Sequence, residues 1–260
     1  RSVVLAGKGV KGTIVEVSEA AGDAAQQING AIVFETGDES EVQHVRIVTR
    51  QHAATVEVQS LLATVGAHAK FDSFALICNA GTVRQQHFVR YAGENTEIGL
   101  RGVNLINKAQ HSDVTLVVDH EVPHGTSREL FKTIAGGEAT GVFQGKVIVR
   151  KYAQKTDGGM KSNALLLNDG ASMYNKPELE IFADDVVCGH GATVAQIDGD
   201  QLFYLMARGL PRPQAEALVL QAFAGEAVEF ITDEDVRDLV IGEVESWLKA
   251  REAASEVSTV

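Results

Sequence analysis

The sequence predicts a mainly β fold, with a coiled β-solenoid over residues 1–197 and a helical subdomain over residues 198–260. Short apolar runs recur from Thr13 to Ile197, about one every fifteen residues, and β-branched residues dominate several of them. Glycine, asparagine and aspartate separate these runs, where turns need a positive φ or a side-chain hydrogen bond. After Gln196 the apolar residues recur with helical spacing, which indicates a change of architecture.

Two features favour a solenoid over a sandwich or a barrel. The hairpin signal Asn-Gly occurs once, at Asn29-Gly30, so hairpins are not the main connection. Segments such as GLRGVNLINKAQHSDVTLVVDH alternate a strand, a short polar corner and another strand, which is typical of stacked solenoid turns. Only Pro123 and Pro177 fall in this region, as expected of strands that need their N–H groups. No strict repeat is visible, and the segment TSRELFKTIAGG, although bounded like a helix, is predicted to be extended.

Three amphipathic helices are expected at the C-terminal end. The first has Asp198 as its cap and stops before Gly209, and the second runs from Pro213 to Gly225. The third opens at Thr232, with acidic residues in its first turn that suit the helix dipole. The expected apolar stripes are Leu202, Leu205 and Met206; Ala215, Leu218, Val219, Ala222 and Phe223; and Val236, Leu239, Val240, Val244, Trp247 and Leu248. We expect these stripes to pack against the β body, or to cap its end, while the last helix also offers its apolar face to a partner.

Composition excludes several classes of protein. The 260 residues are 45% hydrophobic, enough for a substantial core, and the formal net charge of −12 argues against nucleic acid or an anionic membrane as a partner. There is no apolar run of 18 residues, so no transmembrane helix is expected. The start, RSVVLAGKGV, has no signal-peptide pattern and no methionine, and it opens inside a strand-like run, so we expect a fragment or a processed chain. Cys78 and Cys188 are expected to be free thiols in a reducing compartment, the cytosol or an organelle.

Common catalytic motifs are missing from the sequence. It contains no phosphate-binding loop, no G-x-S-x-G elbow and no H-E-x-x-H pair, so the chain is not expected to hydrolyse ATP. His120 and His124 are four residues apart, a spacing that would pair metal ligands on a helix. The surrounding VDHEVPHG is strand-like and contains Pro123, so a solvated corner is expected instead.

Asp184 and Asp185 are adjacent, point to opposite faces of a strand, and are expected to form a corner rather than a carboxylate pair. The other histidines are expected to be hydrogen-bonded surface or half-buried groups, and they are His44, His52, His68, His87 and His111.

The stretch ADDVVCGHGAT contains the strongest candidate for a functional site. Cys188 and His190 are two residues apart, so on an extended strand their side chains point to the same face. A thiolate and an imidazole can share one metal ion, although a closed site usually needs four ligands. A half-buried structural cysteine beside a hydrogen-bonded histidine is the alternative.

Several motifs in a fixed order resemble the SufB/SufD family of iron–sulfur cluster assembly proteins. They are AQKTDG, NALLLNDGA, KPELEIFADDVVCGHGATV and LFYLMARGL, and they extend from about Gly141 to the end of the second helix. A weaker likeness extends back through HSDVTLVVDHEVPHGTSRELFK. The PELEIFADDVVCGHGAT stretch is similar to the SufD form of the family, which has this Cys-x-His, rather than to the SufB form. The family also has a long N-terminal helical segment, which is not found in this sequence.

The resemblance implies a right-handed parallel β-helix and a non-catalytic scaffold subunit. It implies pairing with a SufB-like sister subunit through the β-helix, or a homodimer in isolation. It also implies binding of a SufC-like ATPase through the C-terminal helices, where the expected contact residues are Leu202, Phe203, Leu205, Leu218, Phe223 and Trp247. No cofactor is expected to be permanently bound. His190, with Cys188 alongside, would supply half of an interface site for transient iron or a nascent cluster, with Cys188 as a ligand or a structural residue. The expected location is the cytoplasm, or the plastid stroma in a plant.

Two rival functions remain open from the sequence. The chain can be a SufB-like cluster scaffold, or, as a member of a different class, a β-helix carbohydrate-active enzyme. Such enzymes use carboxylates clustered on one exposed face. The sequence does not assemble that face, and the motif string has no place in those enzymes.

Overall fold

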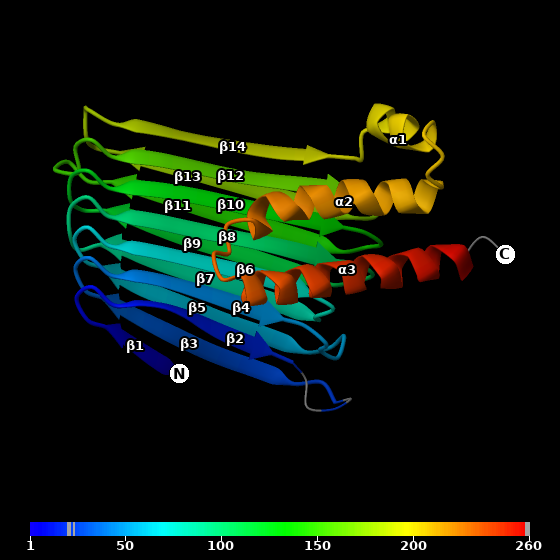
Figure 1. Cartoon of the computed structure of the whole chain (residues 1–260), viewed down its shortest axis with the longest axis horizontal. Coiled ribbons are helices and arrows are strands. Elements are labelled where there is room, and N and C mark those ends of the chain that lie inside the picture. Colours follow the sequence, from blue (N-terminus) through cyan, green and yellow to red (C-terminus); the bar gives the residue numbers. More distant parts are fainter. Residues whose placement is uncertain (20–21, 23, 258–260) are drawn as a thin grey trace.

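The computed structural model describes residues 1–19, 22 and 24–257, and it forms a parallel β-solenoid with three helices along one side (Figure 1). The odd-numbered strands form one seven-stranded sheet, here called the odd sheet: β1 (Ser2–Ala6), β3 (Gln27–Thr36), β5 (Val56–Val65), β7 (Thr82–Tyr91), β9 (His111–His120), β11 (Thr140–Val149) and β13 (Ser172–Ile181). The even-numbered strands form the even sheet: β2 (Lys11–Ser18), β4 (Glu41–Val48), β6 (Lys70–Cys78), β8 (Glu97–Ile106), β10 (Thr126–Ala135), β12 (Asp157–Leu166) and β14 (Val187–Ala195).

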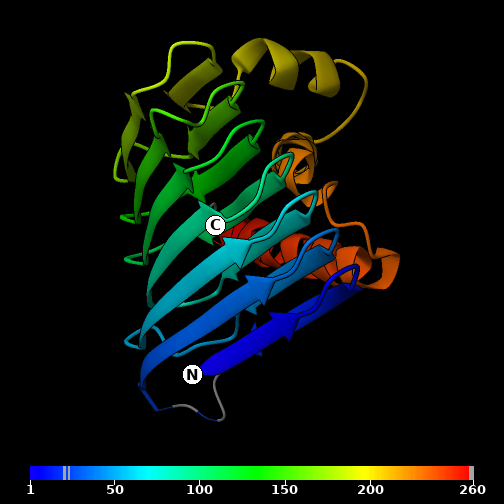
Figure 2. The same ribbon diagram turned by 90° about the vertical axis from the view of Figure 1, so that its left-hand side faces the viewer.

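The chain passes from one sheet to the other at every corner, so each strand pairs in parallel with the strand two places along. Seven strands in each sheet make about seven stacked turns, which Figure 2 shows rising from the blue N-terminal strands to the yellow last strands. The predicted solenoid is confirmed. The helix-like segment TSRELFKTIAGG is extended as expected, because it forms β10 and pairs on both sides.

Every second side chain along a strand points into the solenoid, and these side chains fill its interior. In β7 the side chains of Val83, Gln85, His87, Val89 and Tyr91 are buried, while the residues between them face outward. Because neighbouring strands are in register, inward residues stack in columns from one turn to the next. The interior core contains several aromatic side chains with little or no exposure, namely Phe34, Phe71, Tyr91, Phe131 and Phe143.

The corners contain a repeat that is not visible in the sequence. Residues with positive φ recur at 27- to 31-residue intervals in two series, one at each of two corners. Asparagine and glycine adopt this conformation most readily, but several of these positions hold charged residues or histidine. The first series is Gly9, Glu39, His68, Asn95, His124 and Lys155, and the second is Arg50, Asn79, Lys108 and Gly137.

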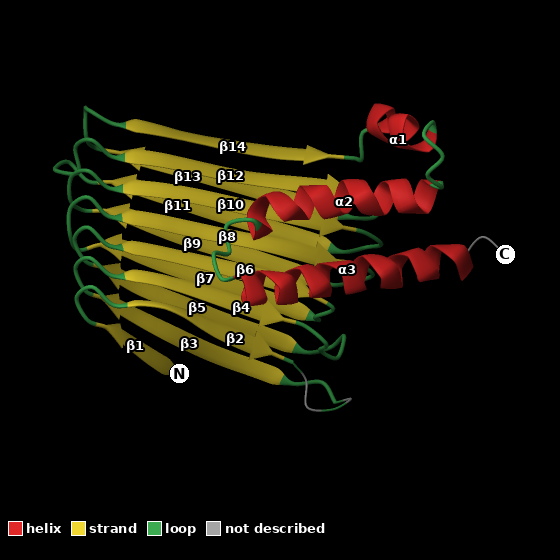
Figure 3. Cartoon of the chain, in the orientation of Figure 1, coloured by secondary structure: helices red, strands yellow, loops and turns green. Residues whose placement is uncertain are grey.

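The three helices are α1 (Gly199–Met206), α2 (Arg212–Val228) and α3 (Glu234–Val257). Asp198 caps α1 through its carboxylate, as expected, and Gly209 follows it with a φ of 92°. Figure 3 shows α2 and α3 lying along the face of the even sheet. They therefore cover a face of the solenoid, rather than its end.

An outer apolar face of the even sheet packs against α2 and α3. The strands contribute Val45, Ile47, Phe74, Leu76, Cys78, Val103, Leu105 and Ile134, and the helices contribute Leu220, Ala224, Ala227, Val228, Val240, Val244, Trp247 and Leu248. Polar contacts join the same surfaces. Lys132 pairs with Glu226, and Gln43 bonds the backbone of Phe230 and Thr232.

Two sequence predictions about α2 were wrong. Gly225 does not end the helix, which continues to Val228. The buried face is also rotated in part: Ala215 and Phe223 of the predicted stripe are packed, but Leu220 and Ala224 join them, whereas Leu218 is 47% exposed. Small alanines on the buried face let the helix approach the sheet closely, and the larger Leu218 is left outside. In α3 the expected stripe is confirmed except for Leu239, which is exposed.

No helix among the described residues is long and apolar enough to cross a membrane.

Candidate functional site

Cys188 and His190 lie on β14, the last strand of the even sheet. The register places Cys188 opposite Gly158 and His190 opposite Met160 on the neighbouring β12. Gly158 and Met160 are buried and face the interior, so Cys188 and His190 belong to two adjacent inward columns. The predicted common face is thus the inner face of the last turn.

The two side chains differ in burial. Cys188 is half-buried against the interior core, and this desolvation raises the pKa of its thiol above the ordinary value. Gly158 beneath it has no side chain, and a Cβ there would lie 3.4 Å from the Cys188 Sγ atom. His190, one column along, is exposed. In the last turn, therefore, the Cys188 thiol is partly buried and the His190 imidazole is exposed to solvent.

Within the described residues, no three histidine, cysteine or acidic side chains are grouped closely enough to hold a metal ion. Cys188 and His190 offer a thiol and an imidazole, side chains that can bind iron, zinc or copper, and among the described residues no third such side chain is grouped with them.

The last strands of both sheets have an open side, here called the open end. In β14 the Val187 N–H group bonds to Thr156 on the β12 side. Because N–H and C=O directions alternate along a strand, the backbone groups of Cys188, His190 and Ala192 point the other way, to the open end. The same residues that direct side chains inward therefore also present an unpaired backbone edge.

The open side of β13 is interrupted in its middle. The N–H groups of Ser172 and Phe182 bond toward β11, so the odd-numbered residues between them face the open end. Pro177 is one of these residues, and it has no N–H group to offer. The β14 edge is thus a more complete template for another strand than the β13 edge.

The corner before β14 is structural, as predicted. Asp185 forms an ion pair with Lys155, and its carbonyl oxygen accepts a hydrogen bond from the Lys155 N–H group. Its own N–H group donates to the Gln154 side-chain oxygen. Asp184 is exposed beside it. The two carboxylates do not form a shared acid pair.

The expectation for His120 was wrong. His120 is fully buried, stacks on Tyr91 with ring centres 4.1 Å apart, and contacts the Ser127 hydroxyl at 3.2 Å. Burial lowers the pKa of His120 to about 4, so the ring is neutral. His124 lies exposed on a corner, so the two histidines share no site. The sequence could have indicated this burial, because His120 continues the alternation of VTLVVDH, in which every second residue faces the interior.

Other buried polar groups were also missed. His44 and His87 are 2% and 5% exposed, rather than half-buried; His44 contacts Glu16 and Ser73, whereas His87 has no hydrogen-bond partner among the described residues. Glu129 is 2% exposed, and neither of its carboxylate oxygens is hydrogen-bonded within the described chain. Desolvation raises the pKa of Glu129 to about 8. The alternation in Ser-Arg-Glu-Leu-Phe puts Glu129 on the same side as a buried phenylalanine, which would have indicated its burial.

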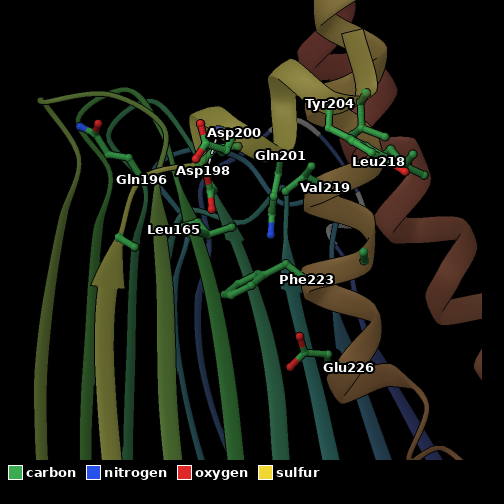
Figure 4. Close-up of a pocket in the computed structure, with 14 residues that line it drawn as sticks. Leu165, Gln196, Asp198, Asp200, Gln201, Tyr204, Leu218, Val219, Phe223 and Glu226 are labelled. Carbon is green, nitrogen blue, oxygen red and sulfur yellow. Dashed lines mark hydrogen bonds between the residues drawn. The ribbon is translucent and has the colours of Figure 1, made fainter. Parts of the chain in front are cut away.

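A second feature is an apolar groove between α1, α2 and the end of the even sheet, with a volume of about 800 Å³ (Figure 4). It brings together three of the predicted partner-binding residues, Leu205, Leu218 and Phe223, and acidic Asp198, Asp200 and Glu226 also line it. The other three predicted residues are not part of the lining. Phe203 is 73% exposed on α1, Leu202 is the buried residue of α1, and Trp247 is 4% exposed within the α3–sheet contact.

Comparison with known families identifies the class of protein. The family model described as "SUF system FeS cluster assembly, SufBD core domain" matches residues 1–223, which include the whole solenoid. The chain belongs to this SufBD family. Within the family it is similar to SufD: the Escherichia coli iron-sulfur cluster assembly protein SufD is 31% identical over 238 residues, which are 91% of this chain and 56% of that protein.

Two further relatives match a smaller share of the chain. The SufBD family protein slr0076 of Synechocystis is 32% identical over 75% of this chain and 43% of its own length. The Arabidopsis thaliana protein named "Protein ABCI7, chloroplastic" is 34% identical over 64% of this chain and 35% of its own length. The chain spans about half the length of the curated relatives that it matches, or less.

Proposed function

We propose that this chain acts as a non-catalytic scaffold subunit in SUF iron–sulfur cluster assembly. In this role it pairs with a SufB-like sister subunit and binds a SufC-like ATPase. The observation that carries the proposal is the position of Cys188 and His190, a thiol and an imidazole on the edge strand of the open end. Membership of the SufBD family of the SUF iron–sulfur cluster system supports the proposal that their cargo is iron or a nascent cluster.

Subunit pairing through the open end is supported by the backbone of β14. An unpaired strand edge is a template for a strand of another chain, because main-chain hydrogen bonds supply affinity without a specific sequence. A partner strand seated beside β14 would place its own side chains next to Cys188 and His190. The sister subunit is the proposed occupant, and a second copy of this chain takes the same edge when the chain is isolated.

Such pairing would complete the half-site. A metal bound by only two side chains is held weakly, whereas ligands from a second chain raise the count toward the four that such sites usually have. Cys188 enters this site as a protonated thiol and loses its proton when it binds metal. The exposed His190 is the residue that a cargo ion reaches first.

The ATPase contact is proposed for the groove between α1 and α2. Its floor is apolar, and its three acidic residues suit a partner segment with apolar and basic side chains. Leu218 lies at this groove and is 47% exposed, which makes it a residue that a partner can cover. The proposed location of the assembly is the cytoplasm, or the plastid stroma in a plant, by analogy with the bacterial and chloroplastic relatives.

A matched pair of variants tests the ATPase contact. Leu218→Glu is expected to abolish capture of a tagged SufC-type ATPase, because it places a charge on the apolar groove. Leu239→Glu is the control, since Leu239 is 48% exposed on α3 and does not line the groove. Both variants are expected to keep the wild-type circular dichroism. Equal capture of the ATPase by the two folded variants would contradict the assigned groove.

A further inference from the structure

The groove between α1, α2 and the even sheet has acidic side chains at both ends and apolar side chains between them (Figure 4). Asp198 and Asp200 lie at the end formed by the start of α1, and both are exposed. Glu226 lies at the other end, seven residues along α2 from Val219, which corresponds to about 10 Å of helix. The apolar middle includes Phe223.

The two acidic ends differ in how their charge is balanced. Lys132 forms an ion pair with Glu226 at 2.5 Å, and its ammonium group lies 4.4 Å from the centre of the Phe223 ring. Among the described residues, none of those that line the groove is a lysine or an arginine, and no ion pair involves Asp198 or Asp200. The unbalanced negative charge of the groove therefore lies at its α1 end.

The helical region around the groove has the same sign of charge. Residues 198–260 contain 13 acidic and five basic residues, so this quarter of the chain holds −8 of the formal net charge of −12. Arg208, which follows α1, stacks on the Tyr204 ring, with its guanidinium carbon 3.6 Å from the ring centre. A surface of one sign attracts a partner of the opposite sign and speeds the encounter between them.

This charge restricts the occupant of the groove. A second copy of this chain is itself acidic, and nucleic acids and anionic membranes are negative as well, so the groove repels all three. A protein segment with basic side chains at one end and apolar side chains along the rest complements it.

We propose that the groove binds such a segment of the SufC-like ATPase in one orientation. Its basic side chains pair with Asp198 and Asp200, and its apolar side chains cover Leu218 and Phe223. The inference rests on the proposed function, because that function places the ATPase at this groove.

The two kinds of contact have different kinetic effects. Exposed charges at the edge of an interface change mainly the association rate and its dependence on salt. Salt screens them, because the Debye length is about 10 Å at 0.1 M ionic strength and about 3 Å at 1 M. We therefore expect association with the ATPase to slow as the salt concentration rises.

Two matched double variants of the full chain test the orientation, with association of a SufC-type ATPase followed by surface plasmon resonance. Asp198→Asn with Asp200→Asn removes two charges at the groove and keeps the cap of α1, because asparagine caps a helix as well as aspartate does. Asp235→Asn with Asp238→Asn is the control, since it changes the net charge equally at exposed positions of α3 that do not line the groove. At low salt, we expect the groove variant to associate about tenfold more slowly than the control.

The possible failures are distinguishable. Equal association rates for the two folded double variants at low salt would overturn this inference alone, and so would a wild-type rate that does not fall as salt is raised, a measurement that needs no variant. A wild-type chain that does not bind the ATPase, or a folded Leu218→Glu variant that binds it as the wild type does, would overturn the proposed groove contact and this inference together.

Discussion

Substitution of Glu129 by glutamine is expected to stabilise the solenoid at neutral and alkaline pH. Glu129 is 2% exposed inside β10, and its carboxylate oxygens find no hydrogen-bond partner among the described residues. Burial raises the pKa of Glu129 from 4.5 to about 8, because the charged form loses its hydration. Glutamine has nearly the same shape and carries no charge at any pH, so it removes this penalty without opening a cavity.

The sign and the size of the effect follow from the two pKa values. Below pH 4.5 the folded and unfolded chains both hold the proton, so the wild-type protein and the variant are expected to have similar stability. Between pH 4.5 and about 8 only the unfolded chain ionises, so the wild-type free energy of unfolding falls as the pH rises. With about 1.4 kcal/mol for each pKa unit, the advantage of the variant grows to about 3 kcal/mol at pH 7 and to about 5 kcal/mol above pH 8.

Urea unfolding followed by circular dichroism between pH 4 and pH 9 measures this advantage. Glu138→Gln, on an exposed corner, is the control, and its difference from wild type is expected to stay small at every pH. A difference between wild type and Glu129→Gln that stays constant over this range would show that Glu129 does not keep its proton in the folded chain.

Three further predictions concern the edges, the thiols and the helices. Pro177→Val restores an N–H group on the open side of β13, so we expect stronger self-association in sedimentation velocity; an unchanged sedimentation coefficient would contradict the assigned edge direction. Iodoacetamide is expected to alkylate the half-buried Cys188 in the native chain but not Cys78, because Cys78 is fully buried and burial raises the pKa of its thiol to about 11. Mass spectrometry distinguishes the two sites, and equal labelling of both cysteines would contradict this expectation. Deletion of residues 198–260 uncovers the outer apolar face of the even sheet, so the truncated chain is expected to aggregate in light scattering; a monomeric, folded truncation would show that α2 and α3 are not needed there.

The strands were predictable because their signal is local. Alternating and β-branched runs such as VTLVVDH form strands wherever a neighbouring turn pairs with them, and every turn of the solenoid provides that neighbour. The corner repeat was not predictable, because positions such as Glu39, Arg50 and Lys155 adopt positive φ without the glycine or asparagine that usually indicates it. At these corners the stacked turns, rather than the residue type, impose the conformation.

The candidate site was predictable in part for a similar reason. The common face of Cys188 and His190 follows from a spacing of two, and it needs no knowledge of the fold. The open backbone edge beside them depends on which strand is last in its sheet, and that is a property of the whole chain. The buried face of α2 also needed the tertiary structure, because leucine and alanine occur on both sides and only the sheet decides between Leu218 and Leu220.

His190→Ala tests the ligand role within the assembled complex. We expect folding and subunit pairing to change by no more than about 1 kcal/mol, because the side chain is exposed. Cluster yield in the reconstituted complex is expected to fall by on the order of tenfold or more. Cys188→Ala on the same face then distinguishes the two roles of the thiol: an unchanged yield assigns it a structural role, and a parallel loss makes it a ligand. A wild-type yield from His190→Ala would contradict the assignment of His190.

The proposed metal site is shared between two chains: Cys188 and His190 supply half of it, and a sister subunit completes it at β14. Iron retained after anaerobic gel filtration, measured for the chain alone and for the chain mixed with a SufB-type subunit, tests it most directly. We expect almost no iron on the isolated chain at concentrations where it is monomeric, and we expect iron on the mixed pair that His190→Ala removes. Tight retention of iron by the isolated monomer, or by the His190→Ala pair at the wild-type level, would contradict it.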